Sequence, residues 1–229
     1  MNKILDSILL SENAMQRFHE YYNDKDFRDW ILTLLPEVEQ CKNLKQDNPW
    51  HVFNCLDHIL KSVEHMNKQT ANLNIKERKM LAYVMFLHDI GKPECYLRRY
   101  SKLYGREVDS FFNHNKSSVK VAERVLPNLG FNNEEIEKMK LLINEHDVFM
   151  FLTLEDDGNK YHSVLTPSVV NEMIVKFNQV GDGAKLLNYL IMVGKSDNLA
   201  QNPQMTKQSF VLLNKMQNIL NTQTKNLEL

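Results

Sequence analysis

The chain has 229 residues, of which 43% are hydrophobic, so it can bury a sizeable core as one large domain or as one domain with a small appendage. Its 28 lysines and arginines nearly balance its 29 aspartates and glutamates, which argues against broad binding of nucleic acid or of a membrane surface by charge alone and leaves room only for a local basic patch. The 3 cysteines are widely spaced and form no Cys-x-x-Cys pair, which is typical of cytosolic usage rather than of a disulfide framework or a cysteine zinc site.

The N-terminus does not have the pattern of a signal peptide, and no apolar run approaches the length that spans a membrane. We therefore expect a cytoplasmic protein with no membrane partner. Glycine (7 residues) and proline (6 residues) are scarce, strand-like alternation is rare, and long helical patterns dominate. These features predict an all-α fold.

The first residues are predicted to form short amphipathic helices, which we treat as a helical extension, residues 1–34, packed on the core. Their apolar spacing predicts helices over residues 4–22 with a break near Ser11, from Asp24 or Asp26 to Leu35 before Pro36, and over residues 37–44.

A longer helix is predicted to start at Asn48 and Pro49, an N-cap followed by proline at the first helical position. His51, His58 and His65 are seven residues apart, which places all three on one face of this helix beside its apolar stripe. Positions 51 and 65 would lie ~21 Å apart along the axis, so at most two of these histidines can approach a single ion. His58 is the central one, and we interpret His65 as a solvated surface residue.

The most apolar segment of the chain begins at Met80 and ends on His88 and Asp89. A helix that is apolar all round is buried, and Gly91 and Pro93 are helix stop signals. A histidine and a carboxylate are therefore expected on the last turn of the most buried helix, where an uncompensated charge costs on the order of several kcal/mol. A divalent cation is the best candidate partner, although a lone His-Asp pair is more often a surface turn or a hydrogen-bonded pair.

The remaining segments alternate between helices and irregular stretches. The pattern predicts a short extended piece or hairpin within residues 94–113, then a helix that begins at His114 and ends before Gly130, and then a helix capped by Asn132 or Asn133 that leads to His146. A surface loop or lid is predicted over residues 150–167. Three helices follow: residues 168–180, a helix after Gly183 that leads to Asp197, and a last helix from Pro203 to Leu220 with a frayed tail.

Several helices thus place a potential metal ligand on or beside an apolar face, namely His58, His88 with Asp89, His114, His146 and Asp197. Each has a simpler explanation when taken alone, such as a core histidine bonded to a backbone carbonyl, an aspartate that caps a helix, or a surface histidine. Polar groups on buried faces cost folding free energy unless they interact with one another. Convergence on one or two cations accounts for all of them.

The order of these residues resembles the HD-domain superfamily of metal-dependent phosphohydrolases, above all the HD domain of bacterial CCA-adding tRNA nucleotidyltransferases. The similarity covers residues 35–202, and its most specific segment is 88–92. This segment is part of a longer match over residues 86–93, and the other matching segments are residues 35–37, 46–51, 56–60, 112–114, 145–147 and 196–201. The resemblance implies an HD-domain helical bundle over residues 35–202, followed by a C-terminal helix and tail over residues 203–229.

The same resemblance implies the metal ligands and the chemistry. The first metal would be bound by His58, His88, Asp89 and Asp197. His114 and His146 would bind a second metal or the substrate phosphate, and Asp89 would bridge the two metals. The cofactor would be one or two ions of Mn, Ni, Co, Fe, Mg or Zn. The expected function is a phosphomonoesterase or phosphodiesterase that acts on a nucleotide or another small phosphate ester through attack of metal-bound hydroxide on phosphorus.

Lys92 is expected to neutralise charge on the phosphoryl oxygens, and His114 or His146, if not a ligand, to hold the phosphate or protonate the leaving oxygen. Lys92 could equally be an ordinary lysine at a helix end. The predicted catalytic residues are Asp89, Lys92, His114 and His146, and the predicted substrate-binding residues are Lys92, His51, Lys116 and Arg98. Arg98, Arg99 and Lys116 could equally form a solvated charged face.

Three other functions stay open: a di-iron oxygenase of the HD type, a non-catalytic helical module whose metal staples the core, and a partner in RNA processing. The near-neutral charge gives nucleic-acid binding only weak support. About 35 residues precede the matching region, too few for the separate nucleotidyltransferase domain of the tRNA enzymes, so we expect no nucleotide addition by this chain alone. The substrate, the metal and the oligomeric state are left open.

Overall fold

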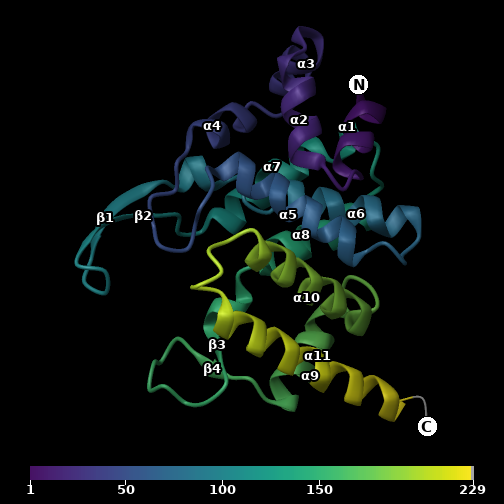
Figure 1. Ribbon diagram of the computed structural model, residues 1–229. Coiled ribbons are helices and arrows are strands. Elements are labelled where there is room, and N and C mark those ends of the chain that lie inside the picture. Colours follow the sequence, from purple (N-terminus) through teal and green to yellow (C-terminus); the bar gives the residue numbers. More distant parts are fainter. Residues whose placement is uncertain (228–229) are drawn as a thin grey trace.

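The computed structural model describes residues 1–227, and it confirms the predicted all-α class (Figure 1). The sheets are small: β1 (Leu97–Ser101) pairs with β2 (Arg106–Ser110) as an antiparallel hairpin, and β3 (Leu152–Thr153) pairs with β4 (Ser163–Val164) in parallel. The α-helices are α1 (Asn2–Leu9), α2 (Ala14–Asn23), α3 (Lys25–Leu34), α4 (Glu37–Asn43), α5 (Cys55–Gln69), α6 (Ile75–Leu87), α7 (His114–Val125), α8 (Asn133–Glu145), α9 (Pro167–Phe177), α10 (Gly183–Leu199) and α11 (Lys207–Leu227). Short 3-10 turns are η1 (Lys92–Cys95), η2 (Pro127–Leu129) and η3 (Val148–Phe151).

Polar caps fix where most of these helices begin. A side-chain oxygen of the N-cap residue accepts a hydrogen bond from a backbone N–H of the first turn, which satisfies a donor that the helix itself leaves free. Asn132 and Glu135 form a reciprocal capping box at the start of α8. The other capping residues are Asp24, Asn54, Asn74, Thr166 and Asp182. Capping thus confirms Asp24 and Asn132 among the predicted alternatives.

The helix predicted from Asn48 begins seven residues later, at Cys55, so this prediction was wrong. Asn54 is the cap and accepts from the backbone N–H of Asp57 at 2.8 Å. The backbone before it is bonded to the far end of the chain instead, because the N–H of Asn202 donates to the carbonyl of Trp50 at 2.8 Å and its side chain donates to Pro49. His51 therefore lies in a loop and not on α5.

Two further expectations differ in detail. The break near Ser11 is complete, since α1 and α2 are separate helices, and the buried side-chain amide of Asn67 donates to the carbonyls of Leu9 and Ser11 between them. The last helix does not fray after Leu220 but continues to Leu227. The amide of Gln223 donates to the carbonyl of Pro167, which ties this last stretch to the start of α9.

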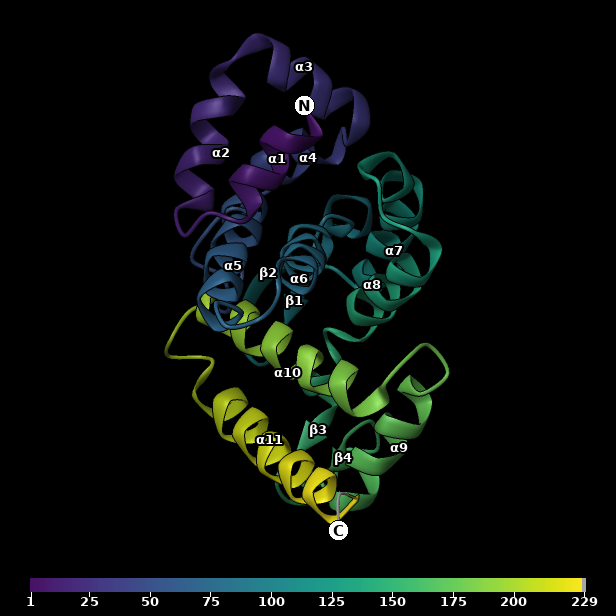
Figure 2. The same cartoon turned by 90° about the vertical axis from the view of Figure 1, so that its right-hand side faces the viewer.

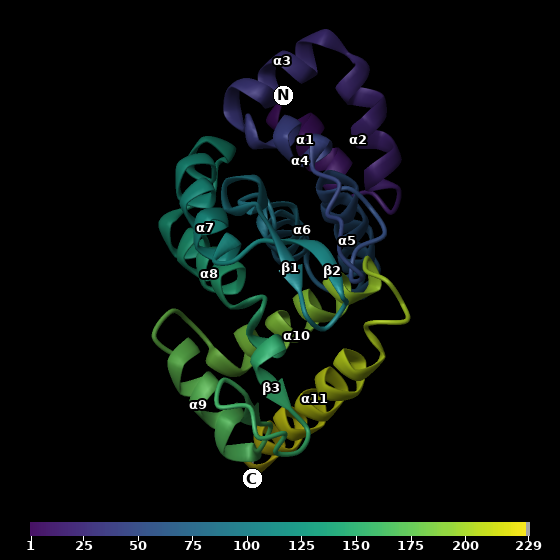
Figure 3. The same ribbon diagram turned by 90° about the vertical axis from the view of Figure 1, so that its left-hand side faces the viewer.

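The core is centred on α6, whose residues from Met80 to Leu87 are all buried. Helix α6 packs against α5, α8, α10 and α1 (Figure 2). Helices α1 to α4 lie at one end of the molecule and α9 and α11 at the other, with the hairpin β1–β2 projecting from the side (Figures 1 and 3). No helix of the described residues is long and apolar enough to cross a bilayer. The division into an extension, an HD domain and a C-terminal helix stays a prediction.

Candidate metal centre

Helix ends from across the fold bring the six predicted ligands together. His58 lies in the first turn of α5, and His114 is the first residue of α7. The other four lie at or after C-terminal ends: His88 and Asp89 follow α6, His146 follows α8, and Asp197 is in the last turn of α10. Their ligand atoms form two groups that share Asp89, and within each group all the atoms lie within 4.8 Å of one another.

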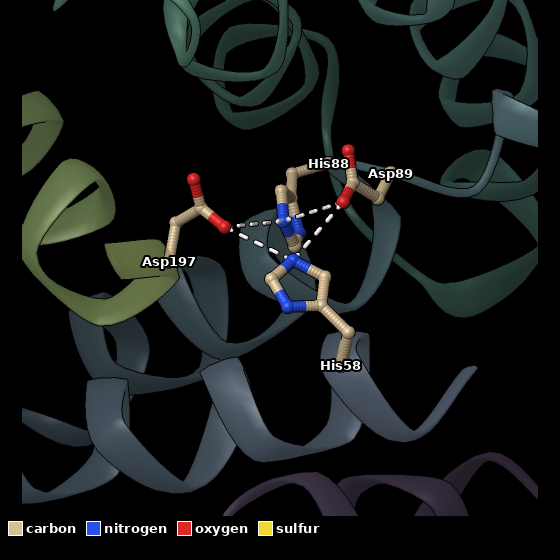
Figure 4. A group of neighbouring side chains, drawn as sticks. All are labelled: His58, His88, Asp89 and Asp197. Carbon is tan, nitrogen blue, oxygen red and sulfur yellow. Dashed lines mark ion pairs between the residues drawn. The ribbon is translucent and has the colours of Figure 1, made fainter. Parts of the chain in front are cut away.

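The first group consists of His58, His88, Asp89 and Asp197 (Figure 4). Nε2 of His58 lies 3.1 Å from Oδ2 of Asp89 and 3.0 Å from Oδ1 of Asp197. Nε2 of His88 lies 3.3 Å and 3.6 Å from the same two oxygens. Both histidine side chains are at most 1% exposed, whereas the Asp197 side chain is 14% exposed, so the group meets solvent on the Asp197 side.

The second group consists of Asp89, His114 and His146. The other oxygen of Asp89, Oδ1, lies 3.0 Å from Nε2 of His114 and 3.6 Å from Nε2 of His146. The two Nε2 atoms are 3.1 Å apart. One Asp89 carboxylate therefore turns a different oxygen towards each group, which is the geometry of a bridging ligand.

All four histidines are oriented in the same way by the backbone. Nδ1 of His88, His114 and His146 lies 2.6 to 2.7 Å from the carbonyl oxygen three residues earlier, and Nδ1 of His58 lies 3.3 Å from the carbonyl of Ala200. Such a contact requires the proton on Nδ1, which leaves Nε2 with its lone pair free. Metal-binding histidines are commonly held by this arrangement. The core-histidine explanation and the ligand explanation are therefore compatible here.

In this arrangement the Nε2 lone pairs of the histidines face the lone pairs of carboxylate oxygens. Nε2 of His58 and Nε2 of His88 are buried and make no well-directed hydrogen bond, although carboxylate oxygens surround them. Ligands about 2.1 Å from a zinc-like ion would be about 3.0 to 3.4 Å apart at neighbouring positions, close to the separations of 3.0 to 3.6 Å in both groups. A cation in each group would satisfy these atoms, so the residues present fit divalent metal ions.

Without a metal, protons on the histidines would supply the positive charge between these ligand atoms. Burial lowers the pKa of His58, but the carboxylates of Asp197 and Asp89 outweigh it and raise this pKa to about 9. The pKa of His88 is likewise lowered by burial and raised more by Asp89 and Asp197, to about 9. Burial raises the pKa of Asp89, yet His88 and Lys92 hold it well below its usual value. The first group thus binds positive charge at neutral pH in either state.

Lys92 is buried, with 4% of its surface exposed, and its ammonium group has three partners. Nζ lies 2.6 Å from Oδ2 of Asp89, 2.9 Å from Oε1 of Gln46 and 3.3 Å from Nε2 of His51. Burial and then the neighbouring Lys92 charge hold the pKa of His51 well below its usual value, so this ring is neutral. Lys92 therefore contacts the carboxylate of Asp89, and His51 contacts Lys92. The predicted contact of both residues with substrate stays a prediction.

The two groups can share Asp89 only because α7 approaches the end of α6 very closely. A Cβ atom at Gly91 would lie 2.4 Å from the backbone N of Ser118 and 2.7 Å from the carbonyl oxygen of His114. The backbone N–H of Gly91 also donates to Oγ of Ser118 at 2.9 Å. A side chain at position 91 would push the start of α7, and His114 with it, away from Asp89.

Two predicted substrate residues lie further out. Arg98, in β1, forms ion pairs of 2.8 Å with Asp109 and 2.9 Å with Asp47, and so fastens the hairpin to the loop before α5. Lys116 is exposed on the first turn of α7. The substrate-binding roles of Arg98 and Lys116 stay predictions.

Sequence reasoning did not include Asp147 or Gln46 among the site residues. Oδ2 of Asp147 lies 3.2 Å from Nε2 of His114, and Oδ1 lies 3.4 Å from Nε2 of His146. A usable signal existed for Asp147, because it follows His146 at a helix end as Asp89 follows His88. For Gln46 the usable signal was its place at the start of the matching segment 46–51. In the structure it adopts a left-handed conformation, with φ of 57°.

The sequence matches no model of a known protein family. The helical fold and the buried His/Asp cluster are consistent with a metal site of the HD type.

Proposed function

We propose that the protein is a divalent-metal-dependent phosphohydrolase that acts on small, nucleotide-like phosphate esters. The observation that carries this proposal is the Asp89 carboxylate, which presents Oδ2 to one pair of histidines and Oδ1 to another. Paired metal sites bridged by a carboxylate are typical of enzymes that stabilise the attacking and leaving oxygens of an in-line displacement at phosphorus. The resemblance to HD-domain phosphohydrolases supports the same reaction.

When bound, divalent cations would lower the pKa of a coordinated water and neutralise phosphoryl charge. The protein's own contribution is to hold the ligands. Backbone carbonyls fix the four imidazole rings, and Lys92 and Gln46 hold the Asp89 side. Because the Nζ partners of Lys92 are protein atoms, its charge would act on the phosphate through Asp89 rather than by direct contact.

Solvent exposure indicates where a substrate would approach. The side chains of Asp147, Asp197 and His114 are 25%, 14% and 11% exposed, whereas those of His58, His88 and His146 are at most 1% exposed. The cluster therefore meets solvent through Asp147, Asp197 and His114, which is where an ester would approach. A purely structural metal needs no such opening, which favours an enzyme over a metal that only staples the core.

Exposed aromatic residues support an organic, base-like leaving group. Phe112, 57% exposed, stands two residues before His114, and the guanidinium carbon of Arg99 lies 4.7 Å from its ring centroid. Trp50, Tyr96 and Phe151 are also exposed, and each lies within nine residues of a ligand along the chain. Planar bases stack on such rings, whereas inorganic phosphate would gain nothing from them.

The test is a screen of the chelator-stripped protein after reloading with Mn, Ni, Co, Fe, Mg or Zn. Release of phosphate or alcohol would be followed with aryl phosphates, nucleotides and cyclic nucleotides. We expect turnover with at least one ion, abolished by chelator, and reduced about a thousandfold or more in His58→Gln. His65→Gln, on the same helix and outside the cluster, is the matched control and should keep full activity.

A folded, metal-loaded sample that hydrolyses none of these esters would overturn the proposal. The iron-loaded protein prepared without oxygen distinguishes the oxygenase alternative, because that activity would consume oxygen and would show the Mössbauer signature of a coupled iron pair. If the metal only staples the core, His58→Gln would lower the melting temperature strongly and no ester would be cleaved by either variant.

A further inference from the structure

We propose that Asp147 is a ligand of the second cation and closes its site from the solvent side. The observation is the position of its carboxylate: the two oxygens are divided between the two histidines of the second group, with Oδ2 at 3.2 Å from His114 Nε2 and Oδ1 at 3.4 Å from His146 Nε2. The proposal rests on the proposed metal binding and goes beyond it by assigning a residue and an order of binding strength.

The two histidines of the second group have no hydrogen-bond donor left for the carboxylates near them. His114 and His146 each use Nδ1 for a backbone carbonyl, so neither neutral ring has a proton left on Nε2. Yet these Nε2 atoms lie 3.1 Å from each other, and Nε2 of His114 has an oxygen of Asp89 at 3.0 Å and one of Asp147 at 3.2 Å. Two imidazole lone pairs and two carboxylates without a donor between them require a shared positive charge.

Both carboxylates lie at ligand-like distances from the two histidine nitrogens. Asp89 Oδ1 lies 3.0 Å and 3.6 Å from the two nitrogens, and the Asp147 oxygens lie at 3.2 Å and 3.4 Å. Three of these four separations fall within the spacing of about 3.0 to 3.4 Å between neighbouring ligands of one ion, and the fourth, from Asp89 to His146, is slightly longer. Asp147 thus lies as close to the histidine pair as Asp89 does.

The two groups differ in their ligand sets. The first group has two histidines and two carboxylates, whereas the second has two histidines and only the carboxylate that it shares. Asp147 gives the second group the same composition as the first. Asp147 is also more exposed than Asp89, since its side chain is 25% exposed and that of Asp89 is 3% exposed. A site with one solvent-exposed ligand should hold its ion more weakly and exchange it faster.

The experiment is a titration of the chelator-stripped wild-type chain with Mn²⁺. Isothermal calorimetry would give the affinities and stoichiometry, and electron paramagnetic resonance would detect coupling between two ions. For the wild type we expect two ions of unequal affinity and a coupled signal. In Asp147→Asn the tighter ion should bind unchanged, the weaker affinity should fall about tenfold or more, and the coupled signal should be lost at the same Mn²⁺ concentration.

Asp156→Asn is the matched control, since it removes the same charge from an exposed residue of the loop between β3 and β4, and it should behave as wild type. Asp147→Glu keeps the carboxylate and should recover part of the weaker affinity. Circular dichroism and thermal melting would show that each variant is folded.

The outcomes are decisive. If the wild type binds no Mn²⁺, the role of Asp147 fails, and the proposed function fails with it if the stripped protein also takes up none of the other ions of the activity screen. If the wild type binds one ion only, or if Asp147→Asn binds two ions with unchanged affinities, the assignment of Asp147 fails while the proposed function stands.

Discussion

Helices α6 and α8 end on the same dipeptide, and the two ends differ mainly in their surroundings. His88 and His146 both continue the right-handed helical backbone, and both place Nδ1 2.6 Å from the carbonyl three residues earlier. The aspartates that follow have different neighbours. Asp89 is buried between the two histidine pairs and contacts Lys92, whereas Asp147 stands at the edge with a side chain 25% exposed.

The difference shows how one local motif can supply two kinds of ligand. A buried carboxylate between two cation sites is held by its neighbours and can bind at both sites, but its removal leaves the buried charges around it unpaired. A carboxylate at the edge can bind or release a cation with little effect on the core. The pair of helix ends therefore predicts a permanent, shared ligand at position 89 and a replaceable one at position 147.

The most severe loss is expected for Asp89→Asn. Both groups lose the negative charge of their shared carboxylate, one of them receives an amide nitrogen in place of its oxygen ligand, and Lys92 loses its ion-pair partner, so metal uptake should fall at both sites and turnover should drop about a thousandfold or more. Breaking a buried pair costs about 3 to 5 kcal/mol, so the free energy of unfolding should fall as well. Metal analysis, activity and chemical denaturation measure the three effects. Uptake of two ions by a folded Asp89→Asn protein would contradict a shared ligand.

Because this variant destabilises the protein under any hypothesis, it does not by itself separate an enzyme from a metal-stapled module. His58→Gln separates them better, since His58 does not contact Lys92 in the described structure.

A second prediction concerns the contact that joins the two helix ends. Gly91→Ala forces a Cβ to within 2.4 Å of Ser118 N, which should cost about 1 to 3 kcal/mol of stability as overpacking and should move His114 away from Asp89. The affinity for the second ion should therefore fall more than that for the first. Calorimetric titration after a thermal melt measures this. Ser118→Ala removes the hydrogen bond to Gly91 without the clash and should have the smaller effect, and equal losses in affinity at both sites would contradict the expectation.

A third prediction is the pH dependence of the first site. The folded pKa values of His58 and His88, about 9, lie above the unfolded value of about 6.5, so in the metal-free protein they contribute stability that is complete below about pH 6.5 and is lost as pH rises through about 9. Metal must displace these protons, so affinity should rise with pH over the same range and level off above it. Melting temperatures and calorimetry in buffers of different ionisation enthalpy measure both trends. A metal affinity that is constant from pH 6.5 to 9 would count against histidine ligands.

The smallest effect is expected on the exposed side of α7. Lys116→Ala should raise KM for an anionic ester a few-fold and leave kcat unchanged, because an exposed cation near His114 contributes mainly to attraction of the substrate. Lys120→Ala, one turn further along the same exposed face, is the control and should change neither constant. The difference should shrink at high salt. Equal effects of the two substitutions would assign Lys116 to an ordinary charged surface.

Local sequence patterns predicted much of the fold. The buried apolar run that ends at His88, the capping Asn132 and the helix that opens at His114 all follow from residue spacing and from side chains that bond to the nearest backbone. Local rules failed where two similar signals competed. Asn48 and Asn54 are both good helix caps, and the bonds from Asn202 to Pro49 and Trp50 hold the first in a loop.

The sequence alone, through spacing and resemblance, predicted the residue types of the site and their places at helix ends, because these depend on periodicities of a few residues. Their meeting could not be worked out from spacing, since His58 and Asp197, or His114 and Asp147, become neighbours only through the packing of distant helices. Which oxygen of Asp89 faces which histidine pair, the burial of Lys92 and the position of Asp147 depend on contacts such as that of Gly91 with α7, where the absence of one methyl group sets the approach. Ångström-scale fit of this kind is a property of the assembled core and not of any short stretch of the chain.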